Sequence, residues 1–111
     1  MNRDMLKRSL QRVGYQVVVA ANGREAVELA QNEAPHLILM DMSLPVMDGL
    51  EATRLIKSNS QTRSIPVIAL TPHTMTEEGN AFAFGWDDYD NKPIDFKRLM
   101  AKILKLLPQD V

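Results

Sequence analysis

The stretch that decides the fold is HLILMD, residues 36–41, in which four consecutive large apolar residues lead to Asp41. A short, continuously apolar run predicts a strand that is buried on both faces of a sheet. A second stretch of this kind, PVIAL, occupies residues 66–70. Strands buried on both faces are typical of parallel sheets with a helical layer on each side. The two stretches therefore indicate an α/β protein.

The rest of the chain alternates between helical and strand-like patterns. Apolar residues at helical spacing predict helices at 2–13, 24–32, 50–58, 74–84 and 94–107, and β-rich segments predict strands at 15–20, 36–41, 66–70 and 86–90. This order predicts a doubly wound parallel sheet with right-handed crossovers. The sequence contains no repeat or interdomain linker, so we expect a single domain over residues 1–111.

Composition and charge exclude several classes of protein. The net charge of −1 offers no basic field for direct binding of nucleic acid, and the lack of cysteine excludes disulfides, cysteine zinc sites and thiol catalysis. The apolar runs are too short to span a bilayer, and the amphipathic N-terminus does not have the pattern of a signal peptide. We therefore expect a cytoplasmic protein without a membrane partner.

Polar residues follow three predicted strands at the point where each strand ends. Asp41 follows the first of these strands, Thr71 the second, and Asn91, Lys92 and Pro93 the third. Ligands of parallel α/β sheets bind at the carboxyl ends of the strands. An aspartate there can attack phosphorus, and a hydroxyl and an ammonium can neutralise the phosphoryl oxygens. The spacing predicts a phosphoryl-accepting site.

Each of these residues also has a simpler interpretation. Asp41 could only begin a turn, Thr71 could supply a turn-forming hydroxyl, and Lys92 could be a solvated surface lysine. None of the three is specific alone. Their placement after three consecutive strands favours the functional interpretation.

Three segments carry a resemblance to a known family. HLILMDMSLPVMDG resembles the phosphorylation segment of response regulator receiver domains, PVIALT resembles their switch strand, and DDYDNKPID resembles their lysine–proline segment. The resemblance to these domains of two-component signalling, the CheY-like superfamily, extends from Met1 to about Leu107. It implies a flavodoxin-like fold of three layers, α/β/α.

The resemblance also implies a role for each matching residue. Asp41 would accept a phosphoryl group from a histidine kinase or phosphotransfer protein, with Thr71 and Lys92 binding that group. Thr71 and Tyr89 would form the switch that a downstream protein effector senses, although Tyr89 could equally be a packed strand tyrosine. Asp41 and the backbone carbonyl of Ser43 would bind Mg²⁺. Receivers are signalling domains, so no enzyme activity is expected beyond self-catalysed phosphorylation and dephosphorylation.

The chain departs from the family at its start. Receivers begin with an apolar strand that ends in two adjacent acids, whereas this sequence starts inside the expected first helix. The magnesium site is then incomplete, and Asp48, Asp87, Asp88 and Asp90 are not expected to replace the missing acids: Asp48 would cap a helix, and Asp87 and Asp88 would lie toward the start of their strand. We expect weak or absent Mg²⁺ binding and slow phosphorylation. The alternative function is a phosphate-independent, receiver-like interaction module.

The missing strand has a structural consequence too. It is central in the family's sheet, between the strands predicted at 15–20 and 36–41. Those two strands could close the gap, a partner could fill it, or strand exchange could produce an intertwined dimer; we expect a homo-oligomer through the exposed sheet edge. A truncated or mis-assigned start is the simpler explanation. A related aspartate-nucleophile phosphatase is disfavoured, because Ser43 stands where such enzymes have a second aspartate.

Overall fold

The computed structural model describes residues 2–42, 49–71 and 85–107. Their elements are α1 (Arg3–Arg12), α2 (Gly23–Glu33), β1 (Ile38–Asp41), α3 (Gly49–Ser58), β2 (Val67–Thr71), β3 (Asp88–Asn91) and α5 (Phe96–Leu106). These bounds agree closely with the predicted helices and with three of the four predicted strands. The helix predicted at 74–84 lies outside the described residues. Within the described ranges, every helix is too short or too polar to cross a membrane.

Polar caps fix where several helices begin. Asn2, Asn22 and Asp95 each accept hydrogen bonds from backbone N–H groups in the first turn of the helix that follows. Such side chains satisfy donors that have no partner inside the helix. Gly14 follows the end of α1 with a φ of 103°, a conformation that L side chains rarely adopt. The helix boundaries therefore follow from local chemistry.

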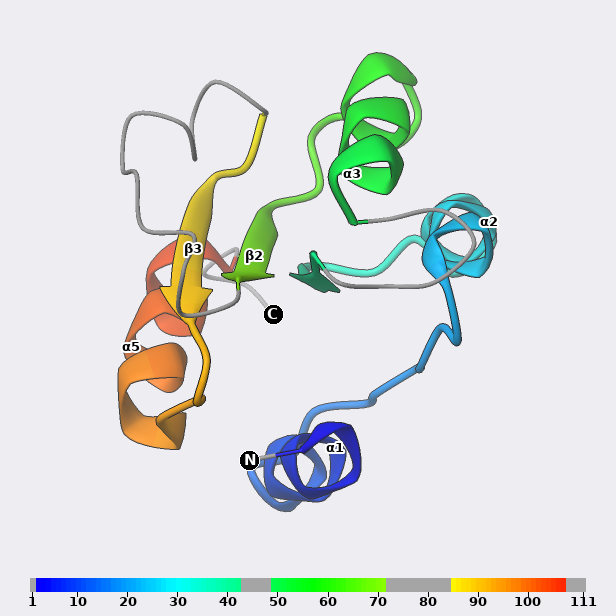
Figure 1. The fold of residues 1–111 in the computed structure, drawn as a ribbon. Coiled ribbons are helices and arrows are strands. Elements are labelled where there is room, and N and C mark those ends of the chain that lie inside the picture. Colours follow the sequence, from blue (N-terminus) through cyan, green and yellow to red (C-terminus); the bar gives the residue numbers. More distant parts are fainter. Residues whose placement is uncertain (1, 43–48, 72–84, 108–111) are drawn as a thin grey trace.

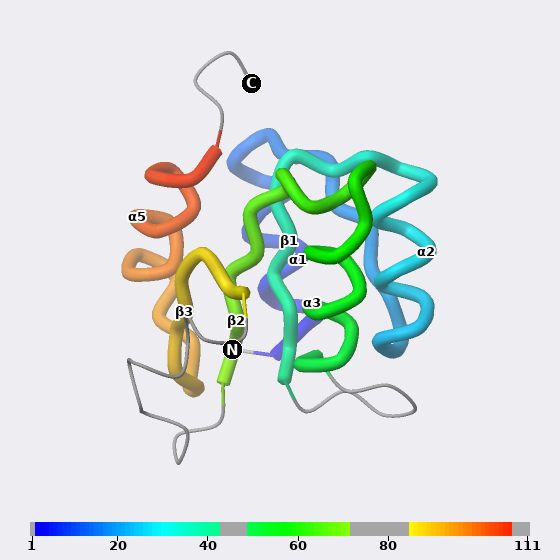
Figure 2. Tube along the Cα trace, turned by 90° about the horizontal axis from the view of Figure 1, so that it is seen from above, coloured from blue at the N-terminus to red at the C-terminus, as the bar shows by residue number. Residues whose placement is uncertain are grey.

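The three strands form a parallel sheet in the order β1-β2-β3. All five residues of β2 are buried, as the continuous apolar run predicted. In the observed register Asp41 lies opposite Leu70, and Thr71 lies opposite Asn91. Viewed from above, the strands lie side by side (Figure 2). This register places the carboxyl ends of all three strands next to one another.

Helices cover both faces of the sheet (Figure 1). On one face Val67 and Ala69 share an apolar cluster with residues of α2 and α3, and on the other Ile68 and Leu70 share a cluster with residues of α1 and α5. The alternation along β2 thus divides the core into two halves. The arrangement is the predicted three-layer, flavodoxin-like architecture with an open parallel sheet.

The prediction of a strand at 15–20 was wrong. This segment connects α1 with α2 as extended chain and belongs to no sheet. Tyr15 and Val17 pack on the same apolar cluster as Leu37 and Leu39. Side-chain packing keeps the segment close to the core, but a strand also needs a hydrogen-bonded neighbour. Within the described part of the chain, β1 pairs with β2 alone and forms an edge of the sheet.

Candidate functional site

Asp41 and Lys92 meet across the end of the sheet. The Lys92 Nζ donates to both carboxylate oxygens of Asp41 at 2.8 Å. Asp41 ends β1 and Lys92 follows β3, so the contact passes over the end of β2. Both side chains are partly exposed, at 39% for Asp41 and 37% for Lys92. The carboxylate and the ammonium were predicted to face each other at the strand ends, and in the structure they are in direct contact. Their chemical role remains a prediction.

Thr71 lies beside this pair but is fully buried. Its hydroxyl donates to Oδ1 of Asn91 at 2.7 Å, and its carbonyl accepts from the backbone N–H of Lys92 at 2.9 Å. The end of β2 thus holds both residues that precede Pro93. The sequence places Asn91 at a strand end but does not show that it is the partner of Thr71. That pairing depends on the register between β2 and β3, in which Thr71 lies opposite Asn91.

Gly49 supports the backbone that carries Asp41. A Cβ atom at this position would lie 2.9 Å from the Cα of Met42 and closer still to the carbonyl oxygen of Asp41. Real Cβ atoms do not approach backbone so closely, so the start of α3 can pack here only as glycine. The sequence shows a glycine at the helix entry but not the contact that requires it.

Tyr89 packs on the apolar cluster between the sheet and the layer of α2 and α3. Lys102 of α5 donates to its carbonyl oxygen and holds its ammonium 5.3 Å from the centre of the ring. At that distance a cation is attracted by the face of the ring. The Tyr89 ring thus packs against the core in this structure, and its switch role remains a prediction.

The described residues do not by themselves fit a magnesium site. Within these ranges there is no group of three histidine, cysteine, aspartate or glutamate residues that could hold a metal ion. Asp41 is engaged by Lys92, and Ser43, the other predicted ligand, lies outside the described residues. Asp87 is at the start of the strands, where its carboxylate pairs with Lys57 at 2.8 Å. Asp87 therefore lies away from Asp41, at the end of the strands where its place in the sequence predicted it.

Comparison with known proteins decides the family. The family model for the response regulator receiver domain matches residues 1–104. The chain is a member of this family. Its expected identity as a receiver domain of two-component signalling, with the CheY-like fold, is confirmed.

Several relatives are similar over most of the chain. The polar-differentiation response regulator DivK of Brucella anthropi is 36% identical over 108 residues, which are 96% of this chain and 88% of DivK. Hybrid signal transduction histidine kinase G of Dictyostelium discoideum is 41% identical over 103 residues, 89% of this chain and 3% of the kinase.

A solved structure has the same fold. The receiver domain of sensor histidine kinase PA1611 from Pseudomonas aeruginosa has a TM-score of 0.85 at 33% identity, covering 95% of this chain and 87% of that domain. That structure has a magnesium ion coordinated in its active site cleft. Receivers therefore occur both as separate regulators and as parts of kinases.

Proposed function

We propose that this receiver domain takes part in a phosphorelay and that Asp41 accepts the phosphoryl group. The donor would be the phosphohistidine of a histidine kinase or phosphotransfer protein. The observation that carries the proposal is the position of the Asp41 carboxylate at a strand end, in direct contact with Lys92. The chain would act as a signalling domain and not as an enzyme on an external substrate.

The residues at the site can perform the transfer as follows. A carboxylate oxygen of Asp41 attacks phosphorus, the P–N bond of the donor breaks, and the departing imidazole keeps the electron pair and takes up a proton from solvent. Lys92 already touches both carboxylate oxygens, so its ammonium can follow the charge onto the phosphoryl oxygens. Orientation and charge neutralisation are the main contributions a protein makes to phosphoryl transfer.

Thr71 would then couple the phosphoryl group to the rest of the domain. Its hydroxyl donates to Asn91 in this structure, and a phosphoryl oxygen on Asp41 would offer a stronger, charged acceptor. A change of acceptor would release Asn91 and alter the end of β3, the strand that also carries Tyr89. A protein effector that binds near β3 and α5 could sense this change.

The test uses beryllium fluoride with magnesium, a mimic of an aspartyl phosphate. Trp86 is buried two residues before β3, in the apolar cluster against which Tyr89 packs, so its fluorescence reports on changes in this part of the core. We expect a saturable change in Trp86 emission and in the NMR signals of Thr71 and Tyr89, and its loss in Asp41→Asn. A change that persists in Asp41→Asn would contradict the proposal.

The second candidate is a phosphate-independent interaction module. It is favoured by two observations: the described residues hold no acidic cluster for a metal, and both oxygens of Asp41 already bind Lys92. This candidate predicts that beryllium fluoride has no effect and that Asp41→Asn binds the protein partner as tightly as the native chain. The two candidates therefore give opposite results in the same titration.

A further inference from the structure

Asp90 is a buried carboxylate on an apolar face of the sheet. It is 2% exposed and pairs in register with Leu70, whose neighbours on this face are apolar residues of α1 and α5. Its Oδ1 accepts from Nε of Arg98 at 2.7 Å and from the backbone N–H of Asn91 at 2.9 Å. Its Oδ2 has no hydrogen-bond partner within the described part of the chain. A strand position that calls for an apolar residue thus holds an acid at a desolvation cost.

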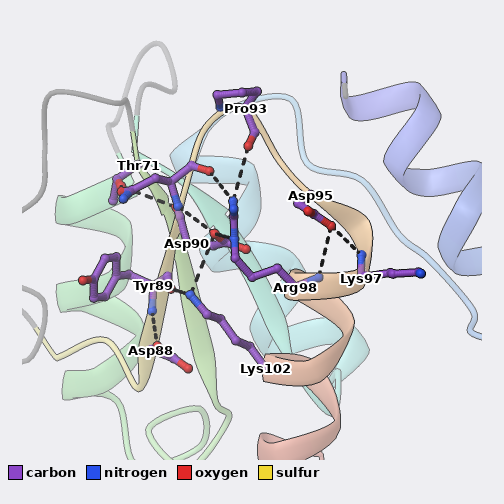
Figure 3. A network of polar contacts seen from close by, with 10 residues as sticks. Thr71, Asp88, Tyr89, Asp90, Pro93, Asp95, Lys97, Arg98 and Lys102 are labelled. Atoms are coloured by element: carbon purple, nitrogen blue, oxygen red, sulfur yellow. Dashed lines mark hydrogen bonds and ion pairs between the residues drawn. The ribbon is translucent and has the colours of Figure 1, made fainter.

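Arg98 connects this acid to the chain on both sides of Lys92. Besides its bond to Asp90, its guanidinium donates through Nη2 to the carbonyl of Asn91 at 3.0 Å and to the carbonyl of Pro93 at 3.3 Å. Figure 3 shows the guanidinium between the buried carboxylate and the turn that leads into α5. These two carbonyls bracket the residue that reaches Asp41.

We propose that Asp90 and Arg98 form a clamp that fixes the 91–93 turn and so positions the Lys92 ammonium against Asp41. Arg98 acts through Lys92 in this arrangement and is a positioning residue. The structural part of the proposal, from clamp to Lys92, stands on the contacts above. Its consequence for phosphoryl transfer rests on the proposed function.

Lys102 makes it possible to separate geometry from charge. Its Nζ lies 3.8 Å from Oδ1 of Asp90, so a second cation faces the buried acid when Arg98 is removed. A lysine at 98 would also keep the charge, but only a guanidinium has the planar fork that can bridge a carboxylate and two carbonyls at once. If the clamp acts through geometry, Arg98→Lys should therefore behave like Arg98→Ala.

The first experiment follows the ¹³C signal of the Asp41 carboxyl carbon by NMR. Lys92→Ala removes its cation and gives the full displacement of this signal. We expect Arg98→Ala and Arg98→Lys to displace it in the same direction by at least half as much, and Arg98→Ala to add nothing in the Lys92→Ala background. The matched control is Arg54→Ala, which removes an exposed arginine paired with Glu51 on α3 and should leave the signal in place.

Two results would overturn the clamp. One is an unchanged Asp41 signal in Arg98→Ala; the other is an equal displacement in the Lys92→Ala background, which would show an effect that bypasses the lysine. The Arg98 side chain is 46% exposed, so its truncation removes little packing from the core, and Lys102 still lies 3.8 Å from the buried Asp90 carboxylate. The signals of buried Trp86 and Ile56 verify this in each variant.

The second experiment measures phosphorylation of Asp41 by acetyl phosphate in the presence of magnesium. A misplaced lysine should slow the transfer by about tenfold in Arg98→Ala, because small displacements of a reacting group are costly. An unchanged rate would show that the clamp does not serve the transfer. If the native chain is not modified at all, the proposed function fails, while the Asp41 signal still decides whether the clamp positions Lys92.

Discussion

The Lys92 ammonium contacts both carboxylate oxygens of Asp41 at 2.8 Å, although β2 lies between β1, which ends at Asp41, and β3, which Lys92 follows. The pair therefore links the carboxyl ends of the two outer strands of the described sheet. More than a third of each side chain remains exposed, so solvent weakens the attraction. A contact of this kind contributes more to the arrangement of the site than to the stability of the fold.

Lys92→Ala should separate these two contributions. We expect the free energy of unfolding to fall by less than about 1 kcal/mol, since exposed ion pairs stabilise proteins weakly. The response of Trp86 fluorescence to beryllium fluoride should be lost. Urea unfolding and the fluorescence titration measure the two effects on the same sample, and a full response in Lys92→Ala would contradict the proposed role of the lysine.

Lys57→Met should lower stability without affecting the site around Asp41. The Lys57 ammonium donates to the carbonyl of Ile65 at 2.7 Å and to Asp87 at 2.8 Å, at the opposite end of the sheet. Its loss removes the lysine donor from the partly buried carbonyl of Ile65 and one donor from Asp87, which keeps the backbone N–H of Val67, so we expect a destabilisation of about 1–3 kcal/mol in urea unfolding. The beryllium fluoride response should persist in the fraction that is folded. A lost response would mean that the site depends on global stability.

Thr71→Val tests the buried hydroxyl. Valine fills the same volume but cannot donate to Oδ1 of Asn91, which would then lack this hydrogen bond. We expect a loss of about 1–3 kcal/mol in unfolding free energy and altered NMR signals at Asn91. Thr71→Ser keeps the hydroxyl and is the matched control for these signals. If the valine and serine variants shift the Asn91 signals alike, the hydroxyl is not what holds Asn91.

Gly49→Ala should disturb Asp41 through the backbone. The added Cβ would lie 2.9 Å from the Cα of Met42 and closer still to the carbonyl of Asp41, so the chain must move. Gly14→Ala is the control, because that glycine has a φ of 103° but open space around it. We expect both variants to be destabilised, the control by about 1–2 kcal/mol of backbone strain. Only Gly49→Ala should displace the Asp41 carboxyl signal in NMR; displacement in both would show that the close contact at Gly49 is not the cause.

The sequence predicted what depends on local pattern. Continuous apolar runs identified β1 and β2, and the polar residues at the ends of these strands and after β3 identified the place where Asp41, Thr71 and Lys92 gather. Parallel strands place their carboxyl ends together, so strand order alone was enough to bring these residues to one place.

What the sequence could not predict depends on register and on neighbours. The segment at 15–20 has a strand-like composition, but composition does not supply a pairing partner. Arg98 meets Asp90 only because α5 packs back along β3, a relation that no spacing in the sequence encodes. Asp90 itself carried a weak signal, as an acid at an alternate position of a half-buried strand.

The open edge of β1 should allow the protein to associate with itself. Within the described residues β1 has a hydrogen-bonded neighbour on one side only, and an unprotected strand edge favours pairing with another chain. We expect sedimentation velocity to show association that increases with protein concentration. Val18, in the unpaired segment, is 57% exposed, and Val18→Lys should weaken association if this segment lies at the interface. Leu104→Lys alters a similarly exposed apolar residue on α5, at 63%, and should have no effect. A monomer at every concentration would refute edge pairing, and weakening by Leu104→Lys instead of Val18→Lys would place the interface on α5.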